Sequence, residues 1–445
     1  MDAATDSRFR RGLYWFTNDL RLADNRALLE AAARCERLLC VYIVDPLWFR
    51  PNRYGLKSIG DSRWQFLQQS LDDLDSALRT LGQQLIVLYQ SPLDAMATTI
   101  TEYGIDAIFR SQNAGYYENQ EWQTLQRRYR MLHFEEHATH TLYNAASLPF
   151  PLEQLPASFT QFRKRMEPFE DFTTLAAPQW LPAPPLGAAT ARPDLPPLGR
   201  TLTSPGFSGG ARHAQAHLRD YLKQRLPSQY KVVRNALDGW ENSTKFSPWL
   251  AAGCLSAKQV FVAIDQYERD VESNESTYWI KFELLWREYF QWYAHAQQQR
   301  LFKLEGIKGQ ATLTSFYPER FQRWCNGNTP FPLVNACMRQ LNQTGYMSNR
   351  GRQVVASCFV NELGLDWRYG AAYFEQQLID YDVASNWGNW QYLAGVGADP
   401  RGKRHFDINK QAATYDPEGA FTRRWRGDTQ VTALDSIDAA DWPIA

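Results

Sequence analysis

The 445-residue sequence lacks a net charge, a paired-cysteine motif and any long apolar run. Lys plus Arg and Asp plus Glu both number 48, so no overall field attracts nucleic acid, and any such contact must be a local patch. The six cysteines form no C-x-x-C pair and have no histidine spacing suited to zinc. This pattern predicts reduced, mostly buried thiols in a reducing compartment, with neither disulfides nor a metal site.

Membrane and export signals are missing as well. The apolar runs, such as Leu38 to Val44, end well before the ~20 residues that a membrane span needs. Charged residues crowd the N-terminus, including Asp2, Asp6 and Arg8, which fits neither a signal peptide nor a transit peptide. We therefore expect a soluble cytoplasmic protein, most simply a monomer, with no membrane partner.

The N-terminal part has the pattern of an α/β domain with a parallel, Rossmann-like sheet. The expected strands are short apolar runs at 13–16, 38–44, 84–89 and 105–109. Between them we expect a helix over 25–34 with Asp24 as its N-cap, and a longer helix over 61–81 that stops at Gly82. No G-x-G-x-x-G follows the first strand, so a dinucleotide bound in the usual Rossmann manner is not expected.

Two domains joined by a long connection are expected from the length and the change in pattern. Residues 1–135 form the α/β domain, and 136–210 form a linker rich in Pro, Gly, Ser and Thr with little periodicity. Residues 211–427 form an all-helical domain, and 428–445 a short tail. The expected helices of the helical domain cover 211–225, 256–271, 278–299, 333–343, 351–363 and 370–378.

The segment from Ser243 to Pro248 places three hydroxyls and a cation just before a helical stretch. The free N–H groups at the start of a helix favour phosphate. An ordinary N-cap accounts for one Ser or Thr, and the segment taken alone favours that explanation. Three hydroxyls and a lysine exceed what a cap requires.

A charged pair lies on the helix predicted for 278–299. Glu283 and Arg287 are four residues apart, with Trp286 beside them. A surface ion pair worth ~0.3–0.5 kcal/mol would explain the spacing. The surrounding sequence, Glu-Leu-Leu-Trp-Arg-Glu-Tyr-Phe, is too apolar for a solvated face, so a half-buried site is indicated.

Further polar faces follow toward the C-terminus. Asp380 and Asp382 are close in sequence, and Asn386 lies one helical turn after Asp382. No histidine or third carboxylate accompanies them, so hydrogen bonding to an organic ligand is favoured over a metal. Trp367 and Trp390 could be simple packing, but their nearness in sequence to these polar residues suggests otherwise.

Taken together, four motifs resemble the FAD-binding region of photolyases and cryptochromes. They are Ser-Thr-Lys-Phe-Ser-Pro-Trp-Leu from 243, Glu-Leu-Leu-Trp-Arg-Glu-Tyr-Phe from 283, Met-Ser-Asn-Arg-Gly-Arg-Gln from 347, and Leu-Ile-Asp-Tyr-Asp from 378 through Trp390. Asn-Arg-Gly-Arg-Gln at 349–353, Tyr381 between the acids, and the stretch 395–401 resemble the DASH branch in particular. The likeness runs from Leu13 to about Trp425.

The resemblance implies FAD in the helical domain. Matching positions assign the cofactor to Tyr230, Ser243, Thr244, Lys245, Phe246, Ser247, Glu283, Arg287, Asn349, Arg352, Asp380, Asp382 and Asn386. Within that set, the hydroxyls of 243, 244 and 247 would hold the pyrophosphate, and Asn386 would face the flavin. In place of the aspartate of plant cryptochromes, its neutral amide can donate or accept a hydrogen bond.

The resemblance also implies a catalytic set for repair of a cyclobutane pyrimidine dimer flipped out of DNA. It consists of Glu283, Trp286, Asn349, Gln353 and Tyr392. A cation cluster of Arg401, Lys403, Arg404 and Arg350 could contact phosphates. Six-four photolyases carry histidine where this chain has Asn349, so their substrate is disfavoured.

The implied electron-transfer chain consists of Trp390, Trp367 and Trp324, and the family's usual outer tryptophan is replaced by Thr314, with Phe316 and Tyr317 nearby. Glu118 resembles the carboxylate that holds an antenna of 5,10-methenyltetrahydrofolate, although Asn113 could align there instead.

Three functions are compatible with these residues. The first is light-driven repair of pyrimidine dimers by a photolyase-type lyase, with single-stranded or locally unpaired DNA preferred as partner. The second is a blue-light photoreceptor with the same flavin site and little repair activity. The third is a light-independent FAD-binding protein. The absence of a long extension after Trp425 argues against a signalling tail of plant or animal type.

Overall fold

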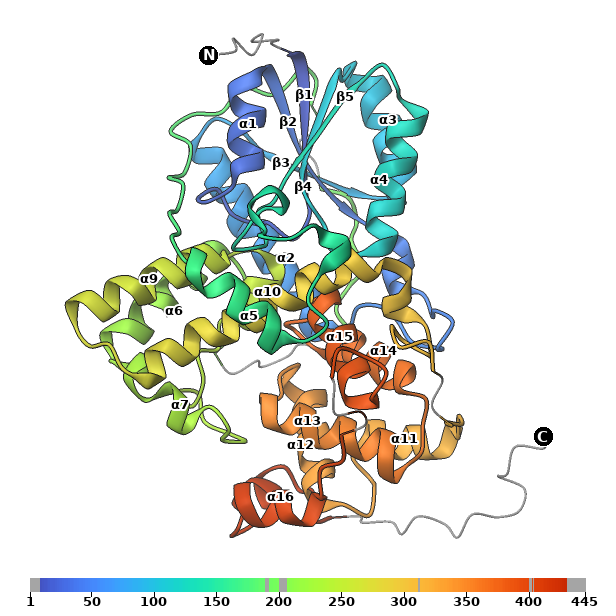
Figure 1. Cartoon of the computed structure of the whole chain (residues 1–445). Helices are drawn as coiled ribbons and strands as arrows, with labels where there is room; N and C mark the ends of the chain where they lie inside the picture. The colour runs from blue at the N-terminus through green and yellow to red at the C-terminus, as the bar shows by residue number, and fades with distance from the viewer. Residues whose placement is uncertain are drawn as a thin grey trace.

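A five-stranded parallel sheet forms the N-terminal part of the molecule, as shown by a computed structural model that describes residues 9–188, 192–199, 206–310, 313–399, 402 and 404–429 (Figure 1). The strand order is β3-β2-β1-β4-β5. The strands are β1 Phe9–Phe16, β2 Cys35–Val44, β3 Leu85–Tyr89, β4 Ala107–Ser111 and β5 His133–His137. The predicted α/β class with a parallel sheet is confirmed.

Helices cover both faces of this sheet, because side chains of successive strand residues point to opposite faces. The helices are α1 Arg26–Arg34, α2 Asp61–Thr80, α3 Pro92–Tyr103 and α4 Tyr116–Arg128. Leu13, Trp15 and Val41 pack on one face against residues of α3 and α4, including Met96 and Trp122. Alternate residues of the same strands join the larger core that continues into the helical part.

Two details of this domain differ from the sequence-based prediction. The prediction of Asp24 as N-cap of the first helix was wrong: the Asn25 side chain accepts the Leu28 N–H at 3.1 Å. Asp24 instead has a positive φ of 52° and accepts hydrogen bonds from Leu175 N–H and Ser256 Oγ. The edge strand β5 was also missed, because its sequence, His-Phe-Glu-Glu-His, has almost no apolar character.

The C-terminal part is helical, as expected. Its helices are α6 Ala211–Lys223, α7 Tyr230–Val233, α8 Ser247–Ala252, α9 Ala257–Asp270, α10 Glu275–Gln297, α11 Pro318–Asn326, α12 Pro332–Thr344, α13 Asn349–Ser357, α14 Trp367–Gln377, α15 Val383–Ala394, α16 Ile408–Tyr415 and α17 Ala420–Arg424. Each of the six expected helices is present with shifted ends. The one expected at 351–363 begins at Asn349, and its last turn, Cys358–Glu362, is a π-helix.

The segment between the two parts contains more structure than its composition suggests. The helix α5, Phe159–Met166, buries Phe159, Phe162 and Met166, and short 3₁₀ turns flank it. In Figure 1 this green segment descends from the sheet and packs beside α10. A proline-rich segment thus still provides one amphipathic helix at the spacing of a packed face.

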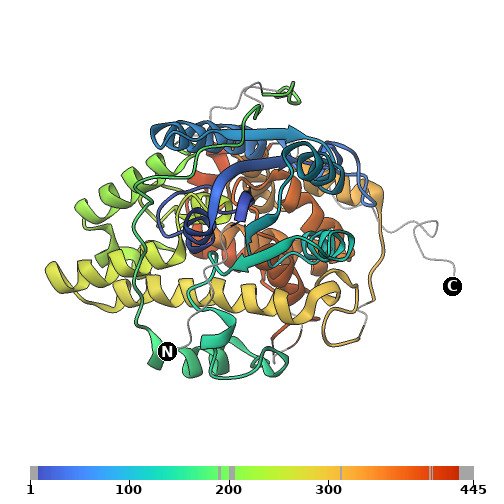
Figure 2. The same ribbon diagram turned by 90° about the horizontal axis from the view of Figure 1, so that it is seen from above.

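Buried polar contacts connect the sheet to the helices. Arg21 is 2% exposed and donates to the carbonyls of Gly253, Asp24 and Thr139 at 2.8–2.9 Å. On α10, Glu288 accepts hydrogen bonds from the backbone of Leu142 at 2.7 Å and from Tyr143 at 3.2 Å. The helix α10 lies below the sheet in Figure 1, and the view from above shows that it crosses most of the molecule's width (Figure 2).

The cysteine side chains lie in the core of the protein. All six cysteines are free and buried. Within the described residues, no helix combines the length and apolar character needed to cross a bilayer, and no group of three metal-ligating side chains is found.

Candidate functional site

A cavity of about 410 Å³ opens among α7, α8, α10, α13 and α15 in the helical part. Most of the sequence-predicted residues line it: Tyr230, Ser243, Thr244, Lys245, Phe246, Ser247, Glu283, Trp286, Arg287, Asn349, Arg352, Gln353, Asp380, Asp382 and Tyr392. Five segments that are far apart in the sequence therefore meet at one place. The volume lies within the range of ordinary ligand sites.

The loop from Ser243 to Ser247 forms one wall. Lys245 adopts a positive φ of 56° and is only 8% exposed. Its ammonium donates to Ser243 Oγ at 3.1 Å and lies 4.9 Å from the centre of the Tyr346 ring. A buried lysine with one neutral hydroxyl and an aromatic ring as partners keeps its positive charge available to an anionic group.

An ion pair fixes the adjoining wall. Arg352 donates to both carboxylate oxygens of Asp380 at 3.0 and 2.8 Å, and Ser247 Oγ donates to the same carboxylate at 2.6 Å. Burial acts against the charge of Arg352, but the Asp380 carboxylate outweighs it and leaves the pKa of the guanidinium above its ordinary value. Arg352 therefore stays cationic beside the cavity.

Asp382 has a structural task besides lining the cavity. It is the N-cap of α15, where one carboxylate oxygen accepts the Ser385 N–H at 2.7 Å. The other oxygen accepts from Gln291 of α10 at 2.8 Å. The carboxylate thus connects α15 to α10 at the rim of the cavity.

Glu283 and Arg287 do not pair with each other. Glu283 forms an ion pair with Arg234, whereas Arg287 donates to the carbonyl of His140 at 2.5 Å. Burial raises the pKa of Glu283, and Arg234 opposes that effect. The surface ion pair considered from the spacing is therefore replaced by two contacts to other elements.

Aromatic rings surround Trp286. Phe159 of α5 stacks on it with 3.8 Å between ring centres and 15° between planes, and Phe290 lies at 5.7 Å. Tyr392 meets it edge-on at 6.1 Å. Arg404 lies over the Tyr392 ring at 4.5 Å. One face of the indole is therefore supported while Trp286 also lines the cavity.

Asn349 and Gln353 share one face of α13 and line the cavity. Among the described residues, neither side chain has a hydrogen-bond partner, so their amides remain available to a ligand. Arg350, between them, contacts Asn235 and Gln411 at 3.2 and 3.5 Å. Arg401 and Lys403 of the expected cation cluster lie outside the described residues.

Other predicted residues lie away from the cavity. Asn386 is 8% exposed, does not line it, and donates to the carbonyl of Ala371 at 3.0 Å. Trp390, Trp367 and Trp324 are all buried. Trp324 and Trp390 are 6.2 Å apart, whereas Trp367 contacts Trp387 at 5.9 Å. Near Thr314, the Phe316 ring stacks on Tyr369 at 4.0 Å.

Glu118 lies in the first turn of α4 and does not line the cavity. Its neighbour Tyr117 packs against Phe302 at 5.4 Å, and Phe302 packs against Trp387 at 4.9 Å. Asn113 accepts the Gly115 N–H at 2.8 Å and so has a local role. An aromatic wall therefore adjoins Glu118 where the two parts of the molecule meet.

Several cavity residues were not found from the sequence. Asn389 continues the face of Asp382, seven residues later and two helical turns away, so its spacing could have indicated it. Arg234 and Tyr346 reach the cavity only through tertiary packing, and no local pattern indicated either of them. Arg234 is the ion-pair partner of Glu283, and Tyr346 supplies the ring beside Lys245.

Known proteins resemble this chain over almost its whole length. Residues 12–184 match the DNA photolyase family, and residues 279–439 match the FAD binding domain of DNA photolyase. The Cryptochrome DASH of Idiomarina loihiensis is 53% identical over 436 residues, covering 98% of this chain and 97% of that protein.

Solved structures give the same result. The Synechocystis cryptochrome has a TM-score of 0.88 at 36% identity, covering 94% of this chain and 88% of that one. A class III photolyase from Agrobacterium tumefaciens has a TM-score of 0.78 at 26% identity, with coverage of 96% and 88%. The sequence match, the fold and the cavity agree, and the chain belongs to the cryptochrome DASH branch of the photolyase and cryptochrome family.

Proposed function

We propose that the protein repairs cyclobutane pyrimidine dimers in DNA, using blue or near-ultraviolet light and FAD. The observation that carries this proposal is a shared cavity: Glu283, Trp286, Asn349, Gln353 and Tyr392 line the same space as the loop 243–247, Arg352 and Asp380. A lesion and a cofactor bound there would be neighbours. Contact between the flavin and the lesion would let an electron pass from one to the other over a short distance.

The residues present fit FAD. The hydroxyls of Ser243 and Ser247 and the ammonium of Lys245 suit the pyrophosphate, and Arg352 and Asp380 offer a cation and a carboxylate to the flavin side. When bound, reduced FAD supplies an electron on excitation. The Asn386 amide donates to the Ala371 carbonyl, and it would have to give up that bond to reach the flavin. We therefore assign Asn386 the role of joining α15 to α14.

The lesion would enter between the aromatic rings and the amides. Trp286, supported from behind by Phe159, offers a rigid ring for stacking, and Tyr392 offers a smaller one. Asn349 and Gln353 have free amides for base edges. Burial makes the Glu283 carboxyl hold a proton more readily than an exposed glutamate, which suits donation to a base carbonyl.

Single-stranded DNA is the expected preferred partner. Extrusion of a base from a duplex costs a few kcal/mol, whereas a single strand has largely met that cost. Base–aromatic stacking returns about 1–3 kcal/mol per base, and Tyr392 stands where duplex-active photolyases commonly have tryptophan. Arg404, over the Tyr392 ring, is placed to contact a nearby phosphate.

Two accessory roles belong to the same proposal. Trp390 of α15, with Trp324 of α11 at 6.2 Å and Trp367 at the start of α14, would feed electrons to the flavin from outside. An antenna such as 5,10-methenyltetrahydrofolate would bind beside Glu118, where Phe302 and Trp387 offer an aromatic wall. The buried reduced cysteines support action in a reducing compartment such as the cytoplasm.

The test is the repair yield per photon on matched single- and double-stranded substrates, with the flavin reduced beforehand. We expect repair of both to be light-dependent and clearly better on the single strand. Equal yields would contradict the strand preference. No repair on either substrate, with reduced flavin confirmed by its spectrum, would contradict the enzyme and favour a photoreceptor.

A further inference from the structure

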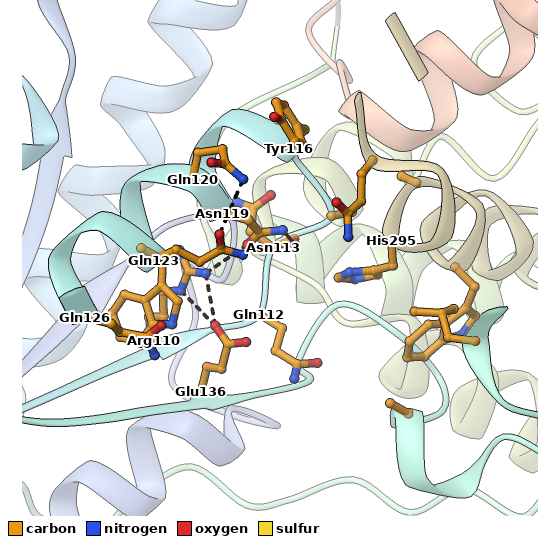
Figure 3. Close-up of a pocket in the computed structure, with 17 residues that line it drawn as sticks. Arg110, Gln112, Asn113, Tyr116, Asn119, Gln120, Gln123, Gln126, Glu136 and His295 are labelled. Carbon is orange, nitrogen blue, oxygen red and sulfur yellow. Dashed lines mark hydrogen bonds and ion pairs between the residues drawn. The ribbon is translucent and has the colours of Figure 1, made fainter. Parts of the chain in front are cut away.

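A second pocket, of about 350 Å³, lies at the carboxyl ends of β4 and β5, between α4 and the end of α10 (Figure 3). Ligands of open α/β sheets bind in crevices at this end of the strands, and pockets occur preferentially at domain junctions. Glu118 does not line this pocket, which uses other residues of α4. Phe302 and Trp387, the aromatic wall proposed for the antenna at Glu118, do not line it either, whereas Asn113 does.

An ion-paired network forms one side of the pocket. The Arg110 guanidinium donates to one oxygen of Glu136 at 3.1 and 3.0 Å, and to Asn119 Oδ1 at 2.9 Å. Its plane lies 4.3 Å from the centre of the Trp122 ring. Arg110 is 1% exposed, so this side is rigid and electrically balanced. The second oxygen of Glu136 accepts no hydrogen bond from the described residues and remains free for a donor.

His295 of α10 faces this network from the opposite side, as Figure 3 shows. Burial and then the nearby Arg110 charge lower the pKa of His295 to about 4. The imidazole is therefore neutral at physiological pH and presents one donor and one acceptor. Among the described residues, neither ring nitrogen has a hydrogen-bond partner.

Carboxamides dominate the remaining lining: Gln112, Asn113, Asn119, Gln120, Gln123, Gln126 and Gln298. In the described part of the chain, the amides of Gln112, Gln126 and Gln298 bond to no other protein group. Tyr116 adds an aromatic ring at the edge. The pocket thus combines many donors and acceptors with one balanced ion pair.

We infer that this amide pocket, defined by the seven carboxamides with Arg110, Glu136 and His295, binds an uncharged ring that carries neighbouring hydroxyl groups. A hydroxyl both donates and accepts, and so do a carboxamide and a neutral imidazole, which makes them matched partners. The same chemistry is present in a hexose and in the ribose of a nucleoside. The volume suits a molecule of that size and lies at the lower end of the range for ligand pockets.

Other ligand classes fit less well. An anion would meet Glu136 and a cation already paired with it, since Arg110 is the one Lys or Arg of the lining. A metal ion would find one carboxylate and one imidazole, fewer protein ligands than such sites use. An apolar ligand would leave the free amides buried without partners, at ~1–3 kcal/mol each.

The experiment uses the full chain loaded with FAD, so that the large cavity is filled. Glucose, adenosine and 2′-deoxyadenosine are titrated separately, with saturation-transfer NMR and thermal shift as readouts. We expect glucose or adenosine to bind and to raise the melting temperature, and 2′-deoxyadenosine, which lacks the neighbouring hydroxyl, to bind more weakly than adenosine. Binding of glucose alone identifies a sugar site, and binding of adenosine alone identifies a nucleoside site.

Two variants and a control locate the binding. Gln112→Leu and His295→Phe should each weaken binding roughly threefold to tenfold, the loss of about one hydrogen bond. Gln299→Leu, next to the pocket but not lining it, should bind as the wild type does. The inference is overturned if neither glucose nor adenosine binds, if both variants bind normally, or if glucose 6-phosphate binds more tightly than glucose.

Discussion

At the scale of single residues, Asp382 shows how a carboxylate that lines the cavity also stabilises the fold. It caps α15 through Ser385 and anchors Gln291. We predict that Asp382→Ala weakens FAD binding by ~1–3 kcal/mol, because hydrogen bonds in a buried site are left unmade. The measurement is FAD affinity by fluorescence titration of the apoprotein.

Loss of a cap alone could lower stability without touching the cofactor. Asp407→Ala is the matched control, since Asp407 caps α16 through Lys410 and does not line the cavity. It should cost a similar ~1 kcal/mol of stability and leave FAD affinity unchanged. Equal FAD affinity in Asp382→Ala and the wild type would remove Asp382 from the cofactor site.

Trp390 tests the proposed supply of electrons. Its ring is 2% exposed and packs against Phe374, Phe359 and Trp324. Trp390→Phe keeps an aromatic ring in that space but removes an oxidisable group. We predict that an external reductant photoreduces the bound flavin much more slowly in this variant. The measurement is the rate at which the absorbance of oxidised flavin is lost under illumination. Trp64→Phe, in the core beside the sheet, should retain wild-type kinetics; the same kinetics in Trp390→Phe would mean that electrons enter elsewhere.

His295 carries a prediction about pH. Its folded pKa of about 4 lies below the ordinary 6.5, so the unfolded chain binds the proton first as pH falls. The contribution of His295 to the free energy of unfolding is therefore unchanged above about pH 6.5 and decreases as the pH falls toward 4. Each pH unit inside that window changes stability by at most ~1.4 kcal/mol. Relative to wild type, His295→Gln should therefore gain about 2 kcal/mol on going from pH 7.5 to pH 5, measured by urea unfolding; an unchanged difference would contradict it.

At the scale of secondary structure, α5 lies in a segment that the sequence suggested was only a linker, yet it packs against the cavity residue Trp286. Phe159 stacks on Trp286, whereas Phe162 packs against Tyr289 one turn away. We predict that Phe159→Ala and Phe162→Ala both cost about 3–5 kcal/mol of stability. Only Phe159→Ala should also weaken binding of a dimer-containing oligonucleotide in the dark, because Trp286 loses its support. Equal binding losses in the two variants would assign α5 a purely structural role.

Elements with strong periodicity were predictable, and elements defined by tertiary contact were not. The buried strands and the long helices α2, α9 and α10 follow from apolar spacing. The edge strand β5 could not be found, since its stability comes from pairing with β4 rather than from apolar side chains. Asn25 rather than Asp24 caps α1 because Asp24 is held by Leu175 and Ser256, residues distant in sequence.

The same division holds for the cavity. The residues that the motifs singled out could be brought to one cavity because each motif lies on one short segment. Arg234 and Tyr346 were missed because they meet their partners only in the folded chain. Asn386 was placed by its motif, yet its amide points to Ala371, a choice that depends on how α15 packs on α14.

At the scale of the whole molecule, Arg21 is a buried side chain that joins the sheet to the helices. Its side chain satisfies three carbonyls, including Gly253 of the helical part. We predict that Arg21→Met destabilises the protein by several kcal/mol, because each buried carbonyl left without a donor costs ~1–3 kcal/mol. Chemical unfolding should then separate into two transitions, seen as non-coincident circular dichroism and tryptophan fluorescence curves.

A second arginine provides the comparison. Arg26 pairs with Glu30 on the surface of α1 and has a 57% exposed side chain. Arg26→Met should change stability by less than about 1 kcal/mol and preserve one transition. A single, unshifted transition in Arg21→Met would show that other contacts hold the two parts together.

The stack of Phe159 on Trp286 also has a consequence for how the chain is made. A ribosome releases Phe159 roughly 130 residues before Trp286, which corresponds to about 6–25 s of synthesis at ordinary rates. During that interval the apolar face of α5, with Phe159, Phe162 and Met166, has no partner from α10. The nascent chain must therefore carry an exposed aromatic segment while the sheet is already complete. Such a segment is a natural binding site for a chaperone that acts during translation.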